Sequence, residues 1–211
     1  MDLSNSYSEV AKEYADRIFD ELSGKPMDRQ ILASFAELIG SGGVVCDLGC
    51  GPGHVTKFLS SKNVKPFGID ISPGMIEQAT RLNPSLDFRV GDMLSLPLAD
   101  ESLHGVVAFY SLIHINKDRL PRAFSEIRRV LKTGGFCLFS FHIGDETVHL
   151  EEWWGHEVNL DFHFFKSKEI SKIVSSCGFE IVDLVERDPY EENIEHQSRR
   201  AYFLVEKTVN F

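Results

Sequence analysis

The sequence predicts an α/β fold with a doubly wound, mostly parallel sheet of seven strands, an antiparallel last strand, and helices before the first strand. Short apolar strands alternate with amphipathic helical segments along all 211 residues. A glycine-spaced turn at residues 49–53 follows the first strand. Acidic residues stand at the ends of three successive strands, at Asp47, Asp70 and Asp92. Together these features are typical of an open sheet that binds a ligand beyond its strand ends.

Two helices precede the first strand. Apolar side chains recur at helical spacing over residues 7–22, before Gly24, and over residues 31–38, before the glycine-rich break at 40–43. The predicted strands cover residues 44–48, 65–70, 86–90, 105–111, 136–141, 179–186 and 200–207. Residues 120–131 form a further amphipathic helix, and Ser167 is predicted to cap a helix that ends at Gly178.

Composition narrows the class of protein. The formal net charge of −10 argues against a surface that follows nucleic-acid phosphates, and the 43% hydrophobic content is enough to fill a core. The four cysteines form no C-x-x-C pair, and no apolar run approaches a membrane span. We expect a single cytoplasmic domain over residues 1–211, monomeric or homodimeric, with 1–41 as an N-terminal helical cap and 142–166 as a candidate lid insertion.

The glycine turn predicts a cofactor site. Its G-x-G-x-G spacing differs from the G-x-G-x-x-G of dinucleotide-binding turns, and Asp47 precedes it. An acid at this place repels phosphates but suits a ligand with an ammonium and a sulfonium group, such as S-adenosylmethionine. Asp70 then stands where an acid accepts hydrogen bonds from ribose hydroxyls, and Asp92 with Met93 stands where adenine would bind.

These motifs resemble the class I S-adenosylmethionine-dependent methyltransferases, most closely their small-molecule, methyltransferase type 11-like branch, over most of the chain. The resemblance implies a Rossmann-like fold in which Asp47 orients the methionine end of the cofactor and Gly49 and Gly51 pass beneath it. One landmark differs, because Leu103-His104 stands where an aspartate often opens the fourth strand. The predicted cofactor-binding residues are Tyr14, Asp47, Gly49, Cys50, Gly51, Gly53, Asp70, Ile71, Asp92, Met93 and Phe109.

His114, after the fourth strand, is the candidate general base. Methyl transfer is an in-line displacement, so the protein aligns the nucleophile and, where needed, accepts its proton. An imidazole suits that task near neutral pH. The alternative is that His114 shapes the pocket or caps the next helix, since many enzymes of this branch work by proximity alone.

Two further segments follow predicted strand ends and are candidates for substrate binding. Residues 142–166 carry Trp153 and Trp154, together with four histidines at intervals of seven. That spacing does not suit one metal ion shared from one helix, so we expect no metal site. The aromatic rings are candidates for a lid, for a sheet-edge cover or for a dimer contact.

The loop before the last strand carries Glu195, His196 and Arg199, which are either solvated ion pairs or substrate contacts. Arg199 is predicted to hold an anionic substrate group in a two-pronged contact. The sequence therefore predicts methyl transfer from S-adenosylmethionine, with S-adenosylhomocysteine as product, to an oxygen or nitrogen atom of a small molecule. The alternatives are an RNA or protein methyltransferase and a non-catalytic module that binds the cofactor.

Overall fold

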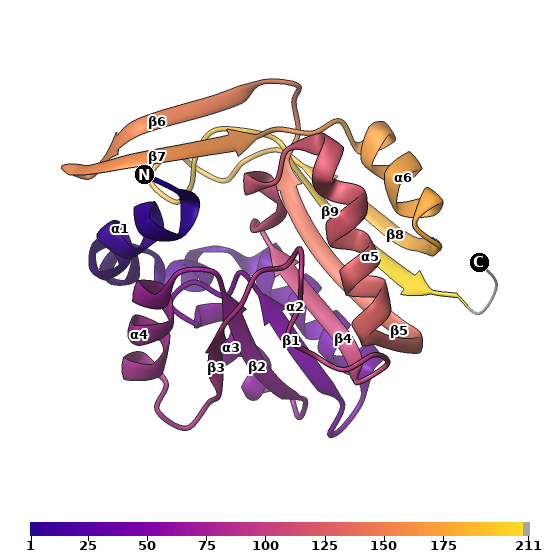
Figure 1. Ribbon diagram of the computed structural model, residues 1–211. Coiled ribbons are helices and arrows are strands. Elements are labelled where there is room, and N and C mark those ends of the chain that lie inside the picture. Colours follow the sequence, from indigo (N-terminus) through magenta and orange to yellow (C-terminus); the bar gives the residue numbers. More distant parts are fainter. Residues whose placement is uncertain (209–211) are drawn as a thin grey trace.

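The computed structural model describes residues 1–208 and contains a seven-stranded sheet flanked by helices (Figure 1). Its strands are β1 (Val44–Leu48), β2 (Lys65–Asp70), β3 (Phe88–Val90), β4 (Leu103–Phe109), β5 (Leu131–His142), β8 (Phe179–Arg187) and β9 (Arg200–Lys207). The strand order is β3-β2-β1-β4-β5-β9-β8, and only the two pairings made by β9 are antiparallel. The predicted mostly parallel sheet with an antiparallel last strand is confirmed.

Helices cover both faces of the sheet. The helices are α1 (Leu3–Ile18), α2 (Pro26–Ile39), α3 (His54–Ser60), α4 (Pro73–Leu82), α5 (Leu120–Val130) and α6 (Ser167–Ser176), with short 3₁₀ segments η1 (Glu21–Gly24), η2 (Leu112–His114) and η3 (Lys117–Arg119). Helices α5 and α6 pack on one face, whereas α2 and α3 pack on the other. Within residues 1–208, every helix is too short or too polar to cross a bilayer.

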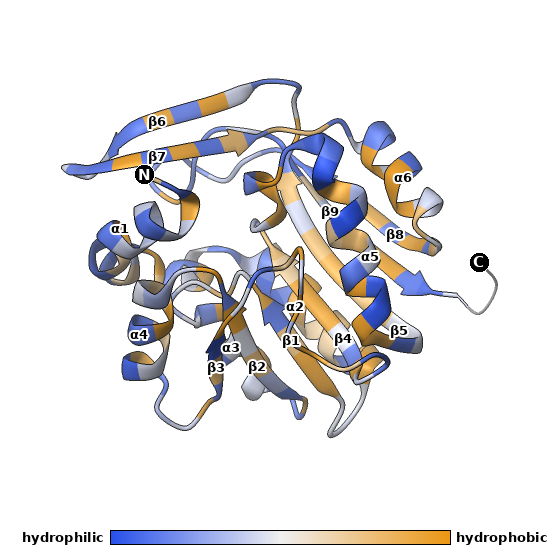
Figure 2. Cartoon of the chain, in the orientation of Figure 1, coloured by the Kyte–Doolittle hydropathy of each residue, from blue (hydrophilic) through white to orange (hydrophobic). Residues whose placement is uncertain are grey.

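The central strands are apolar on both faces because side chains alternate along a strand. On β4, Val106 and Ala108 pack toward α5, whereas Val107 packs toward α2 and α3. Parallel strands that are buried on both sides therefore read as nearly continuous hydrophobic runs. Figure 2 shows these strands as hydrophobic ribbons behind the hydrophilic outer surface of α5.

Several element boundaries differ from the sequence prediction. The first helix ends at Ile18, and η1 then turns the chain so that Leu22 packs beside α2 instead of continuing α1. Strand β5 begins at Leu131, because that residue already pairs with β4. Ser167 is the first residue of α6 and not its cap; Lys166 holds the N-cap position, and the Ser167 hydroxyl has no hydrogen-bond partner in the described structure.

Residues 142–166 contain a β-hairpin outside the main sheet. It consists of β6 (Thr147–Trp153) and β7 (His156–His163), which pair antiparallel. The hairpin lies beyond the carboxyl ends of the central strands, next to α1 (Figure 1). Helix α1 packs against α4 and β7 through a small apolar cluster that includes Val10, Met75 and Leu160. Helix α1 and the hairpin therefore form one wall above the strand ends.

Candidate active site

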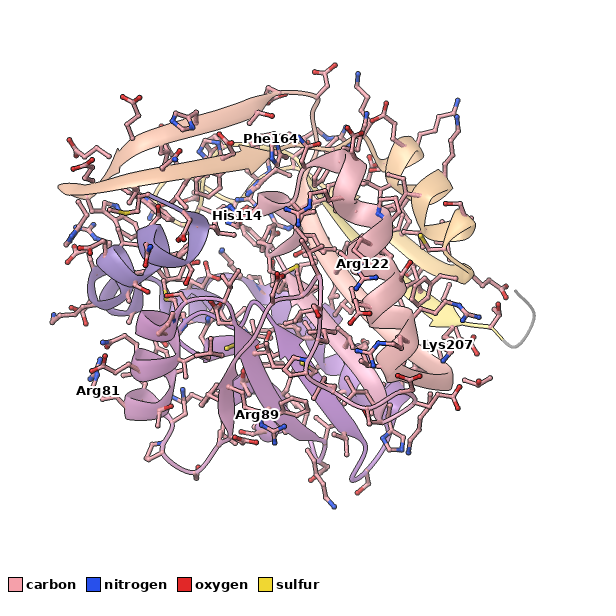
Figure 3. All side chains as sticks on the ribbon, viewed as in Figure 1. Arg81, Arg89, His114, Arg122, Phe164 and Lys207 are labelled. Carbon is pink, nitrogen blue, oxygen red and sulfur yellow. The ribbon has the colours of Figure 1, made fainter. Side chains whose placement is uncertain are left out.

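A cavity of about 680 Å³ lies at the carboxyl ends of β1, β2 and β4, under the wall formed by α1 and the hairpin. Because β9 runs antiparallel to β5, its first residue, Arg200, lies opposite His142, the last residue of β5. Both side chains therefore line the cavity. Figure 3 shows His114 and Phe164 between the hairpin and this edge of the sheet. Ligands bind at this edge in open α/β sheets.

Most of the sequence-predicted site residues line this cavity. They are Tyr14, Gly49, Cys50, Gly51, Asp70, Ile71, Asp92, Met93, Phe109, His114, Trp153, Glu195 and His196. Four do not, namely Asp47, Gly53, Trp154 and Arg199.

The glycine turn brings backbone to the cavity surface. Gly49 has a φ of +74°, and its N–H donates to the carbonyl of Ile69 at 2.7 Å. A Cβ atom at Gly49 would lie 2.3 Å from the Cβ of Ser111, so only glycine fits. Gly53, also at positive φ, is the N-cap of α3 and positions that helix without reaching the cavity. Between them, Cys50 is buried, and burial raises the pKa of its thiol.

Asp70 ends β2 inside the cavity. Its two carboxylate oxygens accept the N–H groups of Gly51 and Ser72, each at 2.9 Å. Burial raises the pKa of Asp70, and these hydrogen bonds oppose that shift. The carboxylate thereby links the glycine turn to the start of α4. Asp92, beyond β3, is exposed and accepts the N–H of Leu94 at 2.8 Å.

Asp47 lies beneath the turn and not in the cavity. Its side chain points to the face of β1 that α3 covers, where it accepts the hydroxyl of Thr56 at 2.6 Å. Burial raises the pKa of Asp47 to about 6. Asp47 does not line the cavity, because strand alternation turns its side chain toward α3, and its contact with the cofactor stays a prediction.

Helix α1 places two tyrosines over the cavity. The Tyr14 ring lies above Gly51, where an added Cβ atom would lie 3.7 Å from it. Tyr14 also packs edge-on against Trp153, with ring centroids 5.6 Å apart. Burial raises the pKa of both Tyr7 and Tyr14. The helical spacing of these rings predicted their shared face, but their place over the cavity depends on how α1 docks.

His114 is held by two hydrogen bonds. Its Nδ1 lies 2.9 Å from the carbonyl oxygen of Asp161, which can only accept, so Nδ1 carries the proton. Its Nε2 lies 2.6 Å from the Tyr7 hydroxyl and therefore accepts from it. Burial lowers the pKa of His114 to about 4, so the imidazole is neutral near pH 7. From the sequence, Tyr7 was expected on an apolar helix face, and its hydrogen bond with His114 was not predicted.

The tip of the hairpin separates the two tryptophans. Trp153 lines the cavity, whereas Trp154 has a φ of +54° and stacks on the outer side of Trp153 at 4.5 Å. The guanidinium of Arg17 covers Trp154 at 5.0 Å. Trp154 therefore does not line the cavity, and its contact with substrate stays a prediction. Across residues 1–208, no group of three or more His, Cys, Asp or Glu side chains is arranged to hold a metal ion.

Arg199 lies outside the cavity, whereas its neighbour Arg200 lines it. Arg199 is exposed, and it pairs with Glu186 at 3.3 Å and Asp188 at 3.2 Å. Arg200, for which the sequence suggested no role, is 3% exposed. The contact of Arg199 with an anionic substrate group stays a prediction.

Glu195 is part of a buried ion network. Its carboxylate pairs with Arg187 at 2.5 Å and accepts the N–H of Tyr190 at 2.7 Å. Burial raises the pKa of Glu195, but the hydrogen bond from Arg187 and its other partners lower it overall. Most of the carboxylate's binding capacity is thus used within the protein, although the residue borders the cavity. His196 borders it too and packs near His142, with ring centroids 6.0 Å apart.

A group of polar side chains near the glycine turn was not predicted from the sequence. Glu21 binds Nε2 of His54 at 3.0 Å and Nζ of Lys25 at 2.6 Å. Burial raises the pKa of Glu21, but these two partners lower it to about 2. Nδ1 of His54 is buried without a hydrogen-bond partner among the described residues. The position of His54, directly after the last glycine of the turn, was the available signal.

Tyr110 is a second missed residue. It follows β4 with a φ of +52°, which is uncommon for a non-glycine residue, and its ring lines the cavity. Its hydroxyl lies 2.7 Å from that of Tyr202, which donates to Asp28 at 2.9 Å. Burial raises the pKa of Tyr110. Its place at a strand end, beside the predicted Phe109, was the signal that could have identified it.

Comparisons with known proteins agree with this geometry. Residues 45–135 match the family described as "Methyltransferase domain". Over 183 residues, the chain is 31% identical to malonyl-[acyl-carrier protein] O-methyltransferase from Hahella chejuensis (strain KCTC 2396), covering 81% of this chain and 63% of that relative. Over 157 residues, it is 29% identical to tRNA (carboxymethyluridine(34)-5-O)-methyltransferase from Arabidopsis thaliana, covering 70% of this chain and 38% of that relative.

The chain therefore spans less than two thirds of the length of either relative. A solved SAM-dependent methyltransferase structure from Methanosarcina mazei superposes with a TM-score of 0.72 at 20% identity, covering 81% of this chain and 94% of that one. This likeness shows the shared fold. With the family match and the motifs along β1, β2 and β3, it leads to one conclusion: the chain belongs to the class I S-adenosylmethionine-dependent methyltransferase family.

Proposed function

We propose that this protein transfers a methyl group from S-adenosylmethionine to an oxygen or nitrogen atom of a small-molecule acceptor. Family membership implies S-adenosylmethionine as the cofactor. One observation carries the rest of the proposal. A single cavity is lined by the glycine turn and Asp70, by the Tyr7–His114 pair and by aromatic rings of the hairpin. A cofactor and an acceptor therefore have room to meet.

The residues present suit the cofactor. The Asp70 carboxylate is buried at a strand end and suits hydrogen bonds from ribose hydroxyls. Gly49 and Gly51 allow close approach to the backbone. We assign the amino-acid end of the cofactor to His54, which lines the cavity and whose Nδ1 has no partner among the described residues. We assign Ile71, Asp92 and Met93 to the adenine pocket, Tyr14 and Phe109 to the walls, and Cys50 and Gly53 to the support of the turn. Asp47 acts through Thr56 and α3.

When bound, the cofactor supplies a methyl group that its sulfonium already activates for displacement. The protein's part is to align the acceptor, exclude water and accept a proton. As the nucleophile bonds to the methyl carbon, its proton passes to the Tyr7 oxygen, and the Tyr7 proton passes to Nε2 of His114. The new imidazolium keeps its Nδ1–H bond to the Asp161 carbonyl. No metal ion has a part in this proposal.

The relatives raise a second candidate acceptor class, since their names specify a carrier protein and a tRNA. The net charge of −10 disfavours RNA, which usually requires a basic face. Tyr7, Trp153, Phe162 and Phe164 line the cavity and favour a compact acceptor with apolar parts. We therefore place the small molecule first and a macromolecular acceptor second.

Titration calorimetry with S-adenosylmethionine and S-adenosylhomocysteine tests the cofactor assignment. We expect both to bind, and Asp70→Ala to weaken binding by roughly 1.5 to 3 kcal/mol through lost charge-assisted hydrogen bonds. Asp87→Asn is the matched control, because Asp87 pairs with Arg89 on the surface. A well-folded protein that binds neither compound would contradict the proposal.

An assay of S-adenosylhomocysteine release tests the reaction itself. Metabolite pools, an acyl carrier protein and unmodified tRNA are supplied as separate acceptors, with and without EDTA. We expect turnover with a metabolite fraction, and turnover that survives EDTA. Turnover with tRNA or carrier protein alone would favour the second acceptor class, and loss with EDTA that a divalent ion restores would contradict a metal-free reaction.

A further inference from the structure

Arg200 brings a buried guanidinium group to the cavity wall, at the end farthest along the sheet from Asp70. Its Nη1 donates to the carbonyl oxygen of Ser198 at 2.6 Å and lies 3.2 Å from Oε1 of Glu195. Its Nε is buried and has no hydrogen-bond partner among residues 1–208. A buried N–H of a charged group is costly to leave unpaired, and a ligand bound in the cavity is one way to complete it.

Arg200 shares its one carboxylate partner with two other cations. Three cations share the Glu195 carboxylate. Its oxygen atoms lie 2.5 Å from a side-chain nitrogen of Arg187, 3.2 Å from one of Arg200 and 3.7 Å from that of Lys25. Lys25 has a second partner in Glu21, and Arg187 has a second partner in Asp28. Arg200 has no second carboxylate among the described ion pairs.

The buried ion network around Arg200 contains three cations and three carboxylates: Lys25, Arg187 and Arg200 face Glu21, Asp28 and Glu195. Arg200 is the cation whose single carboxylate partner is shared with the other two. Its guanidinium group therefore keeps donor capacity for a small anion.

The other neighbours of Arg200 carry no opposing charge. His142 lies opposite it across the β5–β9 pairing, and its Nδ1 bonds to the hydroxyl of Ser198 at 2.7 Å. Burial, together with the positive charge of Arg200, lowers the pKa of His142 to about 3, so its imidazole is neutral. The ring of Tyr110 lies 5.7 Å from the guanidinium carbon. Apart from the Glu195 carboxylate, the groups next to the Arg200 guanidinium are therefore neutral rings.

We propose that the methyl acceptor carries a carboxylate group that binds Arg200. This assignment rests on the proposed methyl transfer and specifies its substrate class. A planar guanidinium recognises a planar carboxylate well, and Nε is the donor in the side-on form of that pair. The remaining, apolar part of the acceptor then lies among Trp153, Phe162 and Phe164.

The test uses the protein saturated with S-adenosylhomocysteine, so that the cofactor end is filled. Acetate, butyrate and phenylacetate are titrated by calorimetry, each beside its uncharged amide of nearly the same shape. We expect at least one carboxylate to bind about tenfold more tightly than its amide. Arg200→Gln should abolish that preference, and Arg200→Lys should retain part of it. Arg199→Gln is the matched control, because Arg199 is the exposed neighbour of Arg200 and lies outside the cavity.

Three results would overturn the proposal. One is that no carboxylate binds to the unaltered protein more tightly than its amide. This result does not depend on whether the Arg200 variants fold. Another is that the preference persists in folded Arg200→Gln protein. A third is a crystal structure of the phenylacetate complex with the carboxylate away from Arg200. Failure of S-adenosylhomocysteine to bind would instead refute the proposed function, and the same titrations without it would still test the carboxylate site.

Discussion

The hydroxyl group of Tyr7 lies 2.6 Å from Nε2 of His114, although 107 positions separate the two residues in the chain. The carbonyl oxygen of Asp161 receives the other ring N–H at 2.9 Å, which fixes the tautomer of the imidazole. Three separate segments, α1, η2 and β7, thus build one hydrogen-bonded relay. Its outer member is a tyrosine, and its inner member is a neutral histidine that can take up a proton.

Removing either member of this relay should slow methyl transfer without affecting cofactor binding. We expect Tyr7→Phe and His114→Gln each to lower kcat by about 10²- to 10⁴-fold, because general-base assistance is of that size. Single-turnover rates with an identified acceptor provide the measurement, and S-adenosylhomocysteine affinity should change by less than about twofold. The control is His149→Gln, because His149 is an exposed histidine on the β6–β7 hairpin. Normal rates in both relay variants would show that alignment alone suffices.

His54 should contribute to binding the amino-acid end of the cofactor. Its Nδ1 is buried without a partner beside the glycine turn, while Glu21 holds Nε2 at 3.0 Å. We expect His54→Ala to weaken S-adenosylhomocysteine binding by roughly 1 to 3 kcal/mol. The binding of 5′-methylthioadenosine, which lacks the amino-acid end, should not change. An equal loss for both compounds would mean that the substitution disturbs the turn as a whole.

Alanine should be tolerated less well at Gly49 of the glycine turn than at another glycine with a positive φ. Gly49 has a φ of +74° and Gly155 a φ of +84°, so alanine at either position takes a backbone conformation that L residues rarely adopt. Only at Gly49 does the added Cβ meet Ser111, at 2.3 Å, whereas nothing lies within 4 Å at Gly155. Gly49→Ala should lower the free energy of unfolding by roughly 1 to 3 kcal/mol more than Gly155→Ala. Urea denaturation measures both, and equal losses would argue against the clash.

Acid should destabilise the fold through its buried histidines. Burial lowers the pKa of His114 to about 4 and that of His142 to about 3, from an ordinary value of 6.5. The unfolded chain therefore takes up protons below about pH 6.5 that the folded chain does not, and stability falls as the pH drops from there toward 4. Asp47 acts in the opposite direction, because burial raises its pKa to about 6 and the folded state binds its proton first.

The unfolding free energy should therefore decline between about pH 6.5 and about pH 4.5, and the decline should be smaller in His142→Gln. Urea denaturation at several pH values in this range measures the slope. Asp47→Asn should steepen it, since the opposing group is removed. An unchanged slope in His142→Gln would show that this imidazole is already accessible to solvent protons in the folded protein.

Local sequence patterns were sufficient for the frame of this protein. Apolar alternation and helical spacing depend on residues close in the chain, so the sheet, its helices and the antiparallel last strand could be read from the sequence. The glycine turn and Asp70 could also be placed at the cavity from the sequence, because the strand ends of a parallel sheet lie at one edge. Tyr14, on α1, was expected only from the resemblance to the family.

Tertiary packing decided which side chains reach the cavity. Asp47, Trp154 and Arg199 stand next to cavity residues in the chain, but strand alternation and the hairpin tip turn them away. The partnership of Tyr7 with His114 depends on how α1 docks onto the hairpin, and that docking is a contact between distant segments. Local sterics determine secondary structure, whereas the relative placement of distant segments follows only from the packing of the whole core.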